Sequence, residues 1–362
     1  MSVADQLIRI KNAKTAIKEA IENKGVVVSD YAKLDEYPAL IDSITVGGGE
    51  SGDGYTNPGF FEFRTQGNTS YKGLFAQIST LDVDLSILDS RNVTDMSYMF
   101  TSFGGNTKRI TNFQSLDYSK VSTIYSMFYY CYAGGTIDLS GISFPELTTA
   151  GRLFYYLYYV TSIDMSNVDM PKVTEVSDMF NLGSGNNVTS INLTGINIPN
   201  ITSASNLFNY CNRLTSIDVS GFNFSKTTNV NSMFGNCSKL VEIIGEIDAS
   251  SASNGFLNYA LSNPFYSCKL LETVYIKNIY KNVTNMTNAS KWSIDLSPTK
   301  IKDECLIYII NELPDLINDK GLTATDKIVF TLPTTNTLTA EQVQVALDKG
   351  WNVANTTYEV SE

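Results

Sequence analysis

The chain has 362 residues, of which 43% are apolar and only 17% charged, and its formal net charge is −11. A strongly acidic chain repels phosphate groups, so nucleic acids and anionic membrane surfaces are not expected partners, and no apolar run is long enough to predict membrane insertion. The chain has no histidine, which excludes Ser-His-Asp and Cys-His catalysis and removes the commonest metal ligand, so we expect neither an enzyme nor a metal or cofactor site.

Residues 1–46 are predicted to form a helical attachment segment. Apolar residues recur at three- and four-residue spacing up to Gly25, and a second short helix is predicted for residues 35–44. So small a unit is marginal alone, so we expect it to dock on other proteins or on copies of itself. The residues predicted to make these contacts are Leu7, Ile10, Ile17, Ile21, Leu40, Ile41 and Ile44. The glycine-rich residues 47–54 are predicted to be a flexible linker.

A repeat then runs from residue 55 to residue 298. Eight copies of a short motif contain a phenylalanine, usually preceded by Met or Leu, at spacings of 25, 28, 26, 26, 28, 26 and 31 residues. The motif phenylalanines are Phe75, Phe100, Phe128, Phe154, Phe180, Phe208, Phe234 and Phe265. A near-constant period of this length predicts a solenoid of about eight repeats.

A second motif lies between the phenylalanines, as in Val160–Ser166 and Leu214–Ser220. Its alternation of Ile or Val with polar residues predicts a short strand, whereas the residues before each phenylalanine are typical of a helical or 3₁₀ turn. We therefore predict an α/β repeat solenoid, leucine-rich-repeat-like, whose short parallel strands stack with helical or 3₁₀ turns. The small N-terminal helical anchor precedes it.

These two motifs in this order resemble the BspA-like leucine-rich-repeat family of bacterial surface proteins. The resemblance covers residues 70–297, and it is carried by segments such as 214–220 followed by 228–237. It implies a stacked-repeat fold and a role in adhesion.

Residues 299–362 are predicted to form a C-terminal α/β cap. A helix is expected from Cys305 to Leu316, a strand at Ile328–Leu332, and a last helix from Leu338 to Lys349. This order, and the N-terminal segments 10–25 and 33–41, are similar to the ends of bacteriophage tail and fibre proteins. An open solenoid needs such a cover for its apolar end.

Two columns of candidate residues follow from the period. Cys131, Cys211, Cys237 and Cys268 each lie three residues after a motif phenylalanine, in a position that Leu157 and Phe103 also occupy, which predicts buried thiols rather than a disulfide or metal site. One position of the predicted strands is polar in four repeats and should face solvent, which predicts a polar ladder along the sheet. The ladder either binds a ligand, as a polar ridge or a weak calcium site, or only forms hydrogen bonds with neighbouring Ser and Thr residues. This ladder consists of Asp138, Asp164, Asn192 and Asp218.

Tyrosines gather in two adjacent repeats, in larger number than the core of a solenoid requires. We name as candidate binding residues Tyr129, Tyr130, Tyr132, Tyr155, Tyr156, Tyr158 and Tyr159. Such amphipathic rings favour contacts with sugars or proteins, although they could instead repack locally or join subunits.

Together these features predict a bacteriophage structural protein of the virion exterior, such as a tail fibre, baseplate appendage or head fibre. We expect it to be assembled in the bacterial cytoplasm as a homo-oligomer, with a trimer as our guess. Its N-terminal helices would bind other virion proteins and its repeats a host-surface glycan or protein. The alternative is a bacterial cell-surface adhesin, against which the absence of a signal-peptide pattern after Met1 argues. A polysaccharide-degrading tailspike would need a carboxylate pair in a groove, and no pair stands out.

Overall fold

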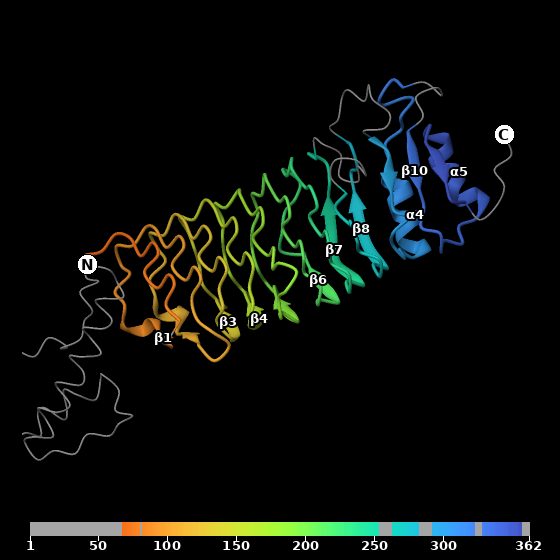
Figure 1. Ribbon diagram of the computed structural model, residues 1–362. Helices are drawn as coiled ribbons and strands as arrows, with labels where there is room; N and C mark the ends of the chain where they lie inside the picture. Colours follow the sequence, from red (N-terminus) through yellow and green to blue (C-terminus); the bar gives the residue numbers. More distant parts are fainter. Residues whose placement is uncertain (1–66, 80–81, 253–262, 282–291, 323–327, 357–362) are drawn as a thin grey trace, which may run out of the picture.

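The computed structural model describes residues 67–79, 82–252, 263–281, 292–322 and 328–356. These residues form a parallel β-solenoid of about nine turns, an elongated stack that advances from the N-terminal to the C-terminal end (Figure 1). The predicted repeat solenoid is confirmed. The predicted attachment segment 1–46, with its seven contact residues, and the linker 47–54 lie outside the described residues.

The strands are short and all of them pair in parallel. They form four sheets, with the orders β1-β2, β3-β4-β5, β6-β7-β8 and β11-β10-β9. The strand bounds are β1 Val83–Asp84, β2 Ile110–Thr111, β3 Gly135–Asp138, β4 Val160–Asp164, β5 Ser190–Asn192, β6 Ser216–Asp218, β7 Glu242–Asp248, β8 Thr273–Lys277, β9 Ile294–Asp295, β10 Val329–Thr331 and β11 Asn352–Ala354. The helices are η2 Leu85–Ile87, η3 Phe113–Ser115, α4 Asp303–Glu312 and α5 Ala340–Asp348.

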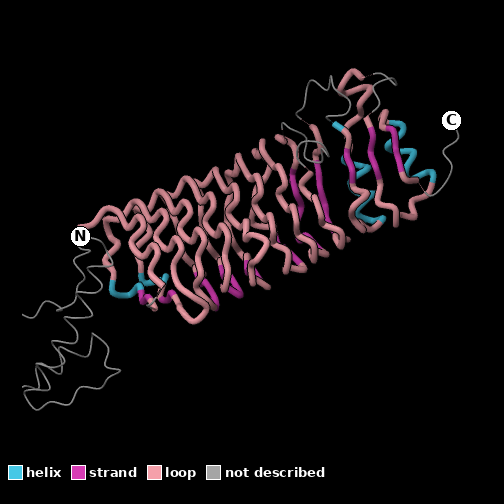
Figure 2. Tube along the Cα trace, in the orientation of Figure 1, coloured by secondary structure: helices cyan, strands magenta, loops and turns pink. Residues whose placement is uncertain are grey.

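Each central turn carries more than the single strand that the sequence predicts. The predicted strands line one side of the stack, and most of each turn is loop (Figure 2). A second parallel ladder of single bridges runs through Ser70, Asp95, Thr123, Thr149, Glu175, Ser203 and Asn229. A third joins Ser143, Asp169 and Asn197. The central turns therefore have three parallel contact lines.

The helical turn predicted before each motif phenylalanine is wrong. In the described residues before position 282, the only helices are the two 3₁₀ segments η2 and η3. Around Phe100 every second amide instead donates to the next turn: Tyr98 N–H to the Tyr125 carbonyl (3.1 Å) and Phe100 N–H to that of Met127 (2.8 Å). The amide of Met99 between them donates three residues back, to Met96. Bonding between turns thus replaces a helix, and the domain is a β-solenoid with few helices.

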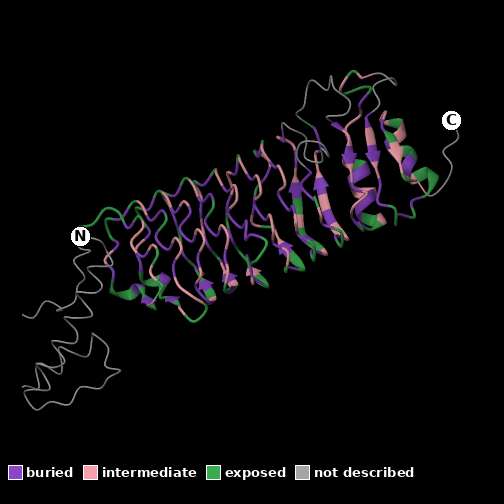
Figure 3. Ribbon diagram, viewed as in Figure 1, coloured by how far each residue is buried: buried purple, intermediate pink, exposed green. Residues whose placement is uncertain are grey.

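The eight motif phenylalanines form one column through the core. Their rings stack nearly parallel, with centroid separations of 5.2 to 5.9 Å between successive turns, and all are buried. Buried residues recur in every turn of the stack, and exposed residues lie mainly along its edges (Figure 3). Stacked rings at this separation contribute roughly 0.5–1.5 kcal/mol per pair beyond their burial.

The motif cysteines are buried free thiols, as predicted. Each thiol donates to a backbone carbonyl of the preceding turn; Cys237 Sγ lies 3.0 Å from the Phe208 oxygen and Cys268 Sγ 2.9 Å from that of Phe234. Burial raises the pKa of Cys131 to about 12. These cysteines therefore fill core space and satisfy carbonyls, and the alternative disulfide is not formed.

The C-terminal elements lie near their predicted positions. Helix α4 packs against β8 and buries Cys305, Leu306, Ile309 and Ile310. Helix α5 begins with a capping box, in which Thr339 and Gln342 bond each other's backbone amides. No helix among the described residues is both long and apolar enough to cross a membrane.

Candidate binding surface

The solenoid register brings together the seven predicted tyrosines, which we call the tyrosine surface: Tyr129, Tyr130, Tyr132, Tyr155, Tyr156, Tyr158 and Tyr159. Three of them follow Phe128 at the same distances as three others follow Phe154, and the stacking of turns pairs them. The ring centroids are 5.4 Å apart for Tyr129–Tyr155, 5.0 Å for Tyr130–Tyr156 and 4.5 Å for Tyr132–Tyr158.

The stacked rings cover one another's faces. Six of the seven tyrosines are consequently half-buried, and only Tyr159 is exposed, at 44%. Gly183 of the next turn closes on Tyr156: a Cβ on this glycine would lie 2.6 Å from the ring. The surface is therefore a packed array of rings rather than a set of loose side chains.

Burial makes three phenol groups of this array harder to ionise. Burial raises the pKa of Tyr155 to about 12 and raises those of Tyr129 and Tyr158. In the described part of the chain, no hydrogen bond engages the hydroxyls of Tyr129, Tyr130, Tyr155, Tyr156 or Tyr159. They can donate to and accept from a ligand.

A cation borders the rings. The Arg152 guanidinium lies 5.4 Å from the centroid of the Tyr155 ring, within cation–π range. It also pairs with Asp178 at 3.5 Å. The arrangement can offer aromatic edges, phenol hydroxyls and positive charge to a partner, but it contains no nucleophile–base pair.

The predicted polar ladder is continuous over three of its four members. Asp138, Asp164 and Asn192 are successive register partners in β3, β4 and β5, whereas Asp218 begins another sheet, where it pairs with Ile244 of β7. Asn192 Nδ2 donates to Asp164 Oδ1 at 3.2 Å, which replaces a carboxylate repulsion by a hydrogen bond.

Each ladder side chain also closes a local turn. The Asp138, Asp164 and Asp218 carboxylates accept the backbone N–H two residues later, each at 2.9 Å. Although burial opposes it, bonds from Ser166 and Asn192 hold the pKa of Asp164 below its ordinary value. Among the described residues, no group of three or more Cys, Asp or Glu side chains is placed to hold a metal ion. The turn bonds account for the ladder, and its binding role stays a prediction.

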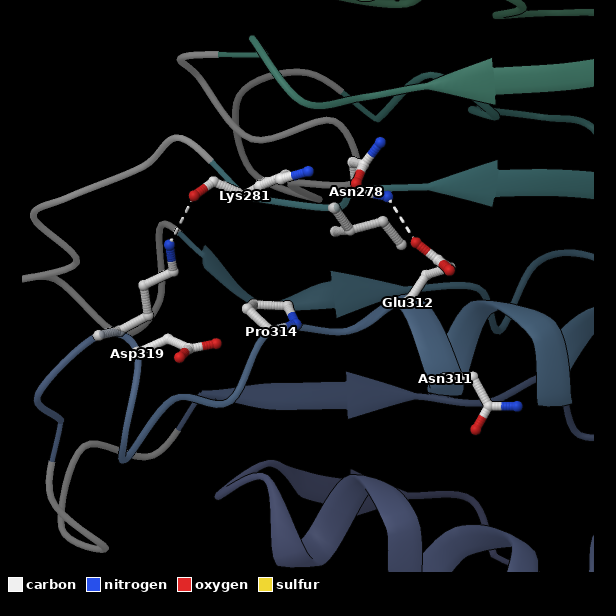
Figure 4. A pocket seen from close by; sticks show the side chains of 8 residues that line it. Asn278, Lys281, Asn311, Glu312, Pro314 and Asp319 are labelled. Carbon is white, nitrogen blue, oxygen red and sulfur yellow. Dashed lines mark hydrogen bonds between the residues drawn. The ribbon is translucent and has the colours of Figure 1, made fainter.

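One pocket was not predicted. It has a volume of about 420 Å³ and lies between the end of β8 and the C-terminus of α4 (Figure 4). Asn278 N–H donates to Glu312 Oε2 at 2.9 Å, and Lys320 Nζ to the Lys281 carbonyl at 3.0 Å. These residues come from separate segments without a shared motif, so no sequence pattern could have indicated them.

Comparison with known proteins identifies the repeats. The profile of a family described as "Mycoplasma protein of unknown function, DUF285" matches residues 55–157 and again residues 148–265, which together span more than half of the chain. The two matches fall on the repeats that carry the BspA-like resemblance, and they support it. No curated protein and no solved structure matches the chain. The resemblance of the two ends to phage proteins stays a prediction.

Proposed function

The chain belongs to the DUF285 family of repeat proteins, and from this premise we propose that it is a non-catalytic attachment protein of a bacteriophage particle. Its solenoid is the binding module, and the tyrosine surface is the part that contacts a glycan or protein of the host surface.

The stacking of the tyrosines is the observation that carries this proposal. A solenoid needs its buried phenylalanine column for stability, but it does not need seven further rings at its rim. Tyrosine is enriched where proteins bind partners, because it supplies a large rigid ring with one polar end. Ring pairs 4.5 to 5.4 Å apart are already stacked in the absence of a ligand, and such preorganisation lowers the entropy cost of association.

The two ends supply the remaining parts of the proposal. Residues 1–46 attach the chain to other virion proteins and to its own copies, with a trimer as the expected state. Residues 299–362 close the solenoid at its C-terminal end. The protein is expected on the exterior of the particle after assembly in the bacterial cytoplasm.

A bacterial cell-surface adhesin is the second candidate. The family profile favours it, because its description names bacteria and not phages. The same tyrosine surface would serve both candidates, which differ in what the N-terminal segment is attached to.

Binding of the purified full chain to host cells tests the function. Tyr129→Ser together with Tyr155→Ser should reduce cell binding at least tenfold, because one stacked pair is lost. A matched variant with Tyr210→Ser and Tyr266→Ser, two tyrosines outside the surface, should bind normally. Equal binding by both variants would remove the tyrosine surface from the proposal.

Electron cryo-microscopy of phage particles separates the two candidates. Density for the solenoid on the particle, with residues 1–46 against another virion protein, is the expected result. The protein on the bacterial envelope but absent from particles would favour the adhesin.

A further inference from the structure

Positive charge without negative charge collects on the tyrosine side of the first four described turns. The segments 125–135 and 151–161 carry the tyrosine surface, and 71–79 and 97–109 precede it in the stack. None of the four contains Asp or Glu, whereas the turn that follows them brings Asp178 beside Arg152. The four segments contain four basic residues, Lys72, Lys108, Arg109 and Arg152. In a chain of net charge −11, this is a local reversal of sign.

Three of these cations, Lys72, Arg109 and Arg152, are exposed, and two of them lie over tyrosine rings. Lys72 Nζ is 5.9 Å from the centroid of the Tyr98 ring, and Arg152 lies over Tyr155. Arg109 rests on Gly134 and Gly135, where a Cβ would collide with the guanidinium at 2.6 and 2.9 Å. These two glycines leave the space for the guanidinium, which donates to the Asn106 and Lys108 carbonyls at 3.1 Å each.

A line of contacts connects Lys72 with Arg152 across the turns. The ring of Tyr98, under Lys72, meets that of Tyr125 at 5.8 Å, and Tyr125 lies against Gly151, the neighbour of Arg152. In the described part of the chain, neither the Lys72 ammonium nor the Arg109 guanidinium forms an ion pair, although the backbone N–H of Arg109 donates to the Asp82 carboxylate at 2.8 Å. The ion pair of Arg152 with Asp178 is loose at 3.5 Å. The charges are therefore available to an anion.

We propose that the tyrosine surface, extended by Lys72, Arg109 and Arg152, binds an acidic polysaccharide whose chain lies along the axis of the stack. The cations pair with carboxylate groups of the polymer, and the phenol hydroxyls bond its sugar hydroxyls. The proposal rests on the attachment function above and specifies the chemistry of its ligand.

The geometry favours a polymer over a protein partner. Equivalent tyrosines recur on two successive turns along the axis, as a repeating ligand requires. Protein partners usually anchor an apolar side chain in a desolvated pocket. Two pockets in the described part of the chain, of about 420 and 340 Å³, are lined by other residues, and the tyrosine faces are already covered by one another.

The experiment compares two polymers that differ only in charge. Titration of the full chain with polygalacturonate should show binding that weakens at least tenfold between 50 and 500 mM NaCl, because salt screens exposed charges. The fully methyl-esterified polymer has the same backbone without carboxylates and should bind at least tenfold more weakly.

A charge-matched pair of variants locates the site. Lys72→Gln, Arg109→Gln and Arg152→Gln together should weaken polygalacturonate binding at least tenfold. Lys120→Gln, Lys172→Gln and Lys226→Gln change the net charge equally, but these lysines bond Asn92, Glu146 and Asn200 on another line of the stack and should not affect binding. Unchanged thermal unfolding of both variants verifies their fold.

Other outcomes overturn the inference. Equal binding of the charged and esterified polymers would do so, as would equal loss in the two triple variants. Equally tight binding of single-stranded oligothymidylate would indicate a general polyanion surface instead of a glycan site. If polygalacturonate fails to bind while host cells are still bound through Tyr129 and Tyr155, the attachment function stands and only the acidic ligand is wrong.

Discussion

Left-handed backbone recurs at two fixed places in most turns, two residues before and two after the motif phenylalanine. Non-glycine residues occupy most of them, including Tyr98 (φ 58°), Ser126 (φ 54°) and Arg152 (φ 55°). The conformation costs an L-residue roughly 1–2 kcal/mol. The left-handed conformation persists because it orients every second backbone N–H toward a carbonyl of the next turn. The hydrogen bonds between turns therefore offset the backbone strain.

Ser126→Gly is predicted to stabilise the solenoid by about 1 kcal/mol. Glycine removes the left-handed strain, which outweighs the roughly 0.4–1 kcal/mol of unfolded-state entropy that it adds. It also removes a buried hydroxyl that has no hydrogen-bond partner within the described structure. Urea denaturation of Ser126→Ala provides the control, since alanine deletes the hydroxyl but keeps the strain. A glycine variant less stable than the alanine variant would contradict this account.

Alkaline pH is predicted to destabilise the protein through its buried thiols. The folded pKa of Cys131 is about 12, raised by burial from 9.0. Unfolded chains therefore lose this proton first, so the contribution of the thiol is complete below pH 9 and is lost as the pH rises toward 12. The Cys131 thiol thereby lowers the free energy of unfolding by about 1.4 kcal/mol per pH unit in this window. Urea denaturation at pH 8, 9 and 10 should show a shallower decline for Cys131→Val, and an identical slope would argue against burial as the cause.

At the scale of elements, the phenylalanine column couples neighbouring turns. Phe180 stacks on Phe154 at 5.4 Å and on Phe208 at 5.2 Å, whereas Phe75 begins the described column and stacks only on Phe100. Phe180→Ala should cost about 3–5 kcal/mol and, because repeats contact only their neighbours, should split chemical unfolding into two transitions. Phe75→Ala should cost less and leave one transition. Equal costs would mean that the column does not transmit stability along the stack.

The period of Phe75 to Phe265 was enough to predict this column, because a fixed spacing puts equivalent residues at one place in every turn. The strands at Ile137, Ile163 and Ile191 were predictable from alternation. The conformation of the turns before Phe100 and Phe128 was not predictable, because their amides donate to residues about 26 positions away. Local helix propensity depends only on neighbouring residues and cannot indicate such partners. The tyrosines could be placed on two turns, but that their faces cover one another required the register.

At the scale of the whole molecule, a stack grows by adding identical interfaces and must stop at its ends. At the C-terminal end the regular turns give way to α4, which covers β8, and the Lys300 and Lys302 amides bond the Leu271 and Glu272 carbonyls (2.9 and 3.0 Å). The same surface that lets a ninth turn follow an eighth would accept a turn from another molecule. The positive charge around the tyrosines makes the two ends of the stack different, because the proposed binding residues lie on the N-terminal turns.

Removal of residues 299–362 is predicted to make the protein associate end to end. The truncation uncovers the apolar residues of β8 that α4 buries, and an open parallel stack is a template for another. Light scattering after size exclusion should show a larger particle than the full chain gives at the same concentration. Removal of residues 340–362 alone deletes α5 and β11 but keeps α4 on β8, so this shorter truncation should associate less. If the longer truncation keeps the oligomeric state and the urea denaturation midpoint of the full chain, the C-terminal segment does not cap the solenoid.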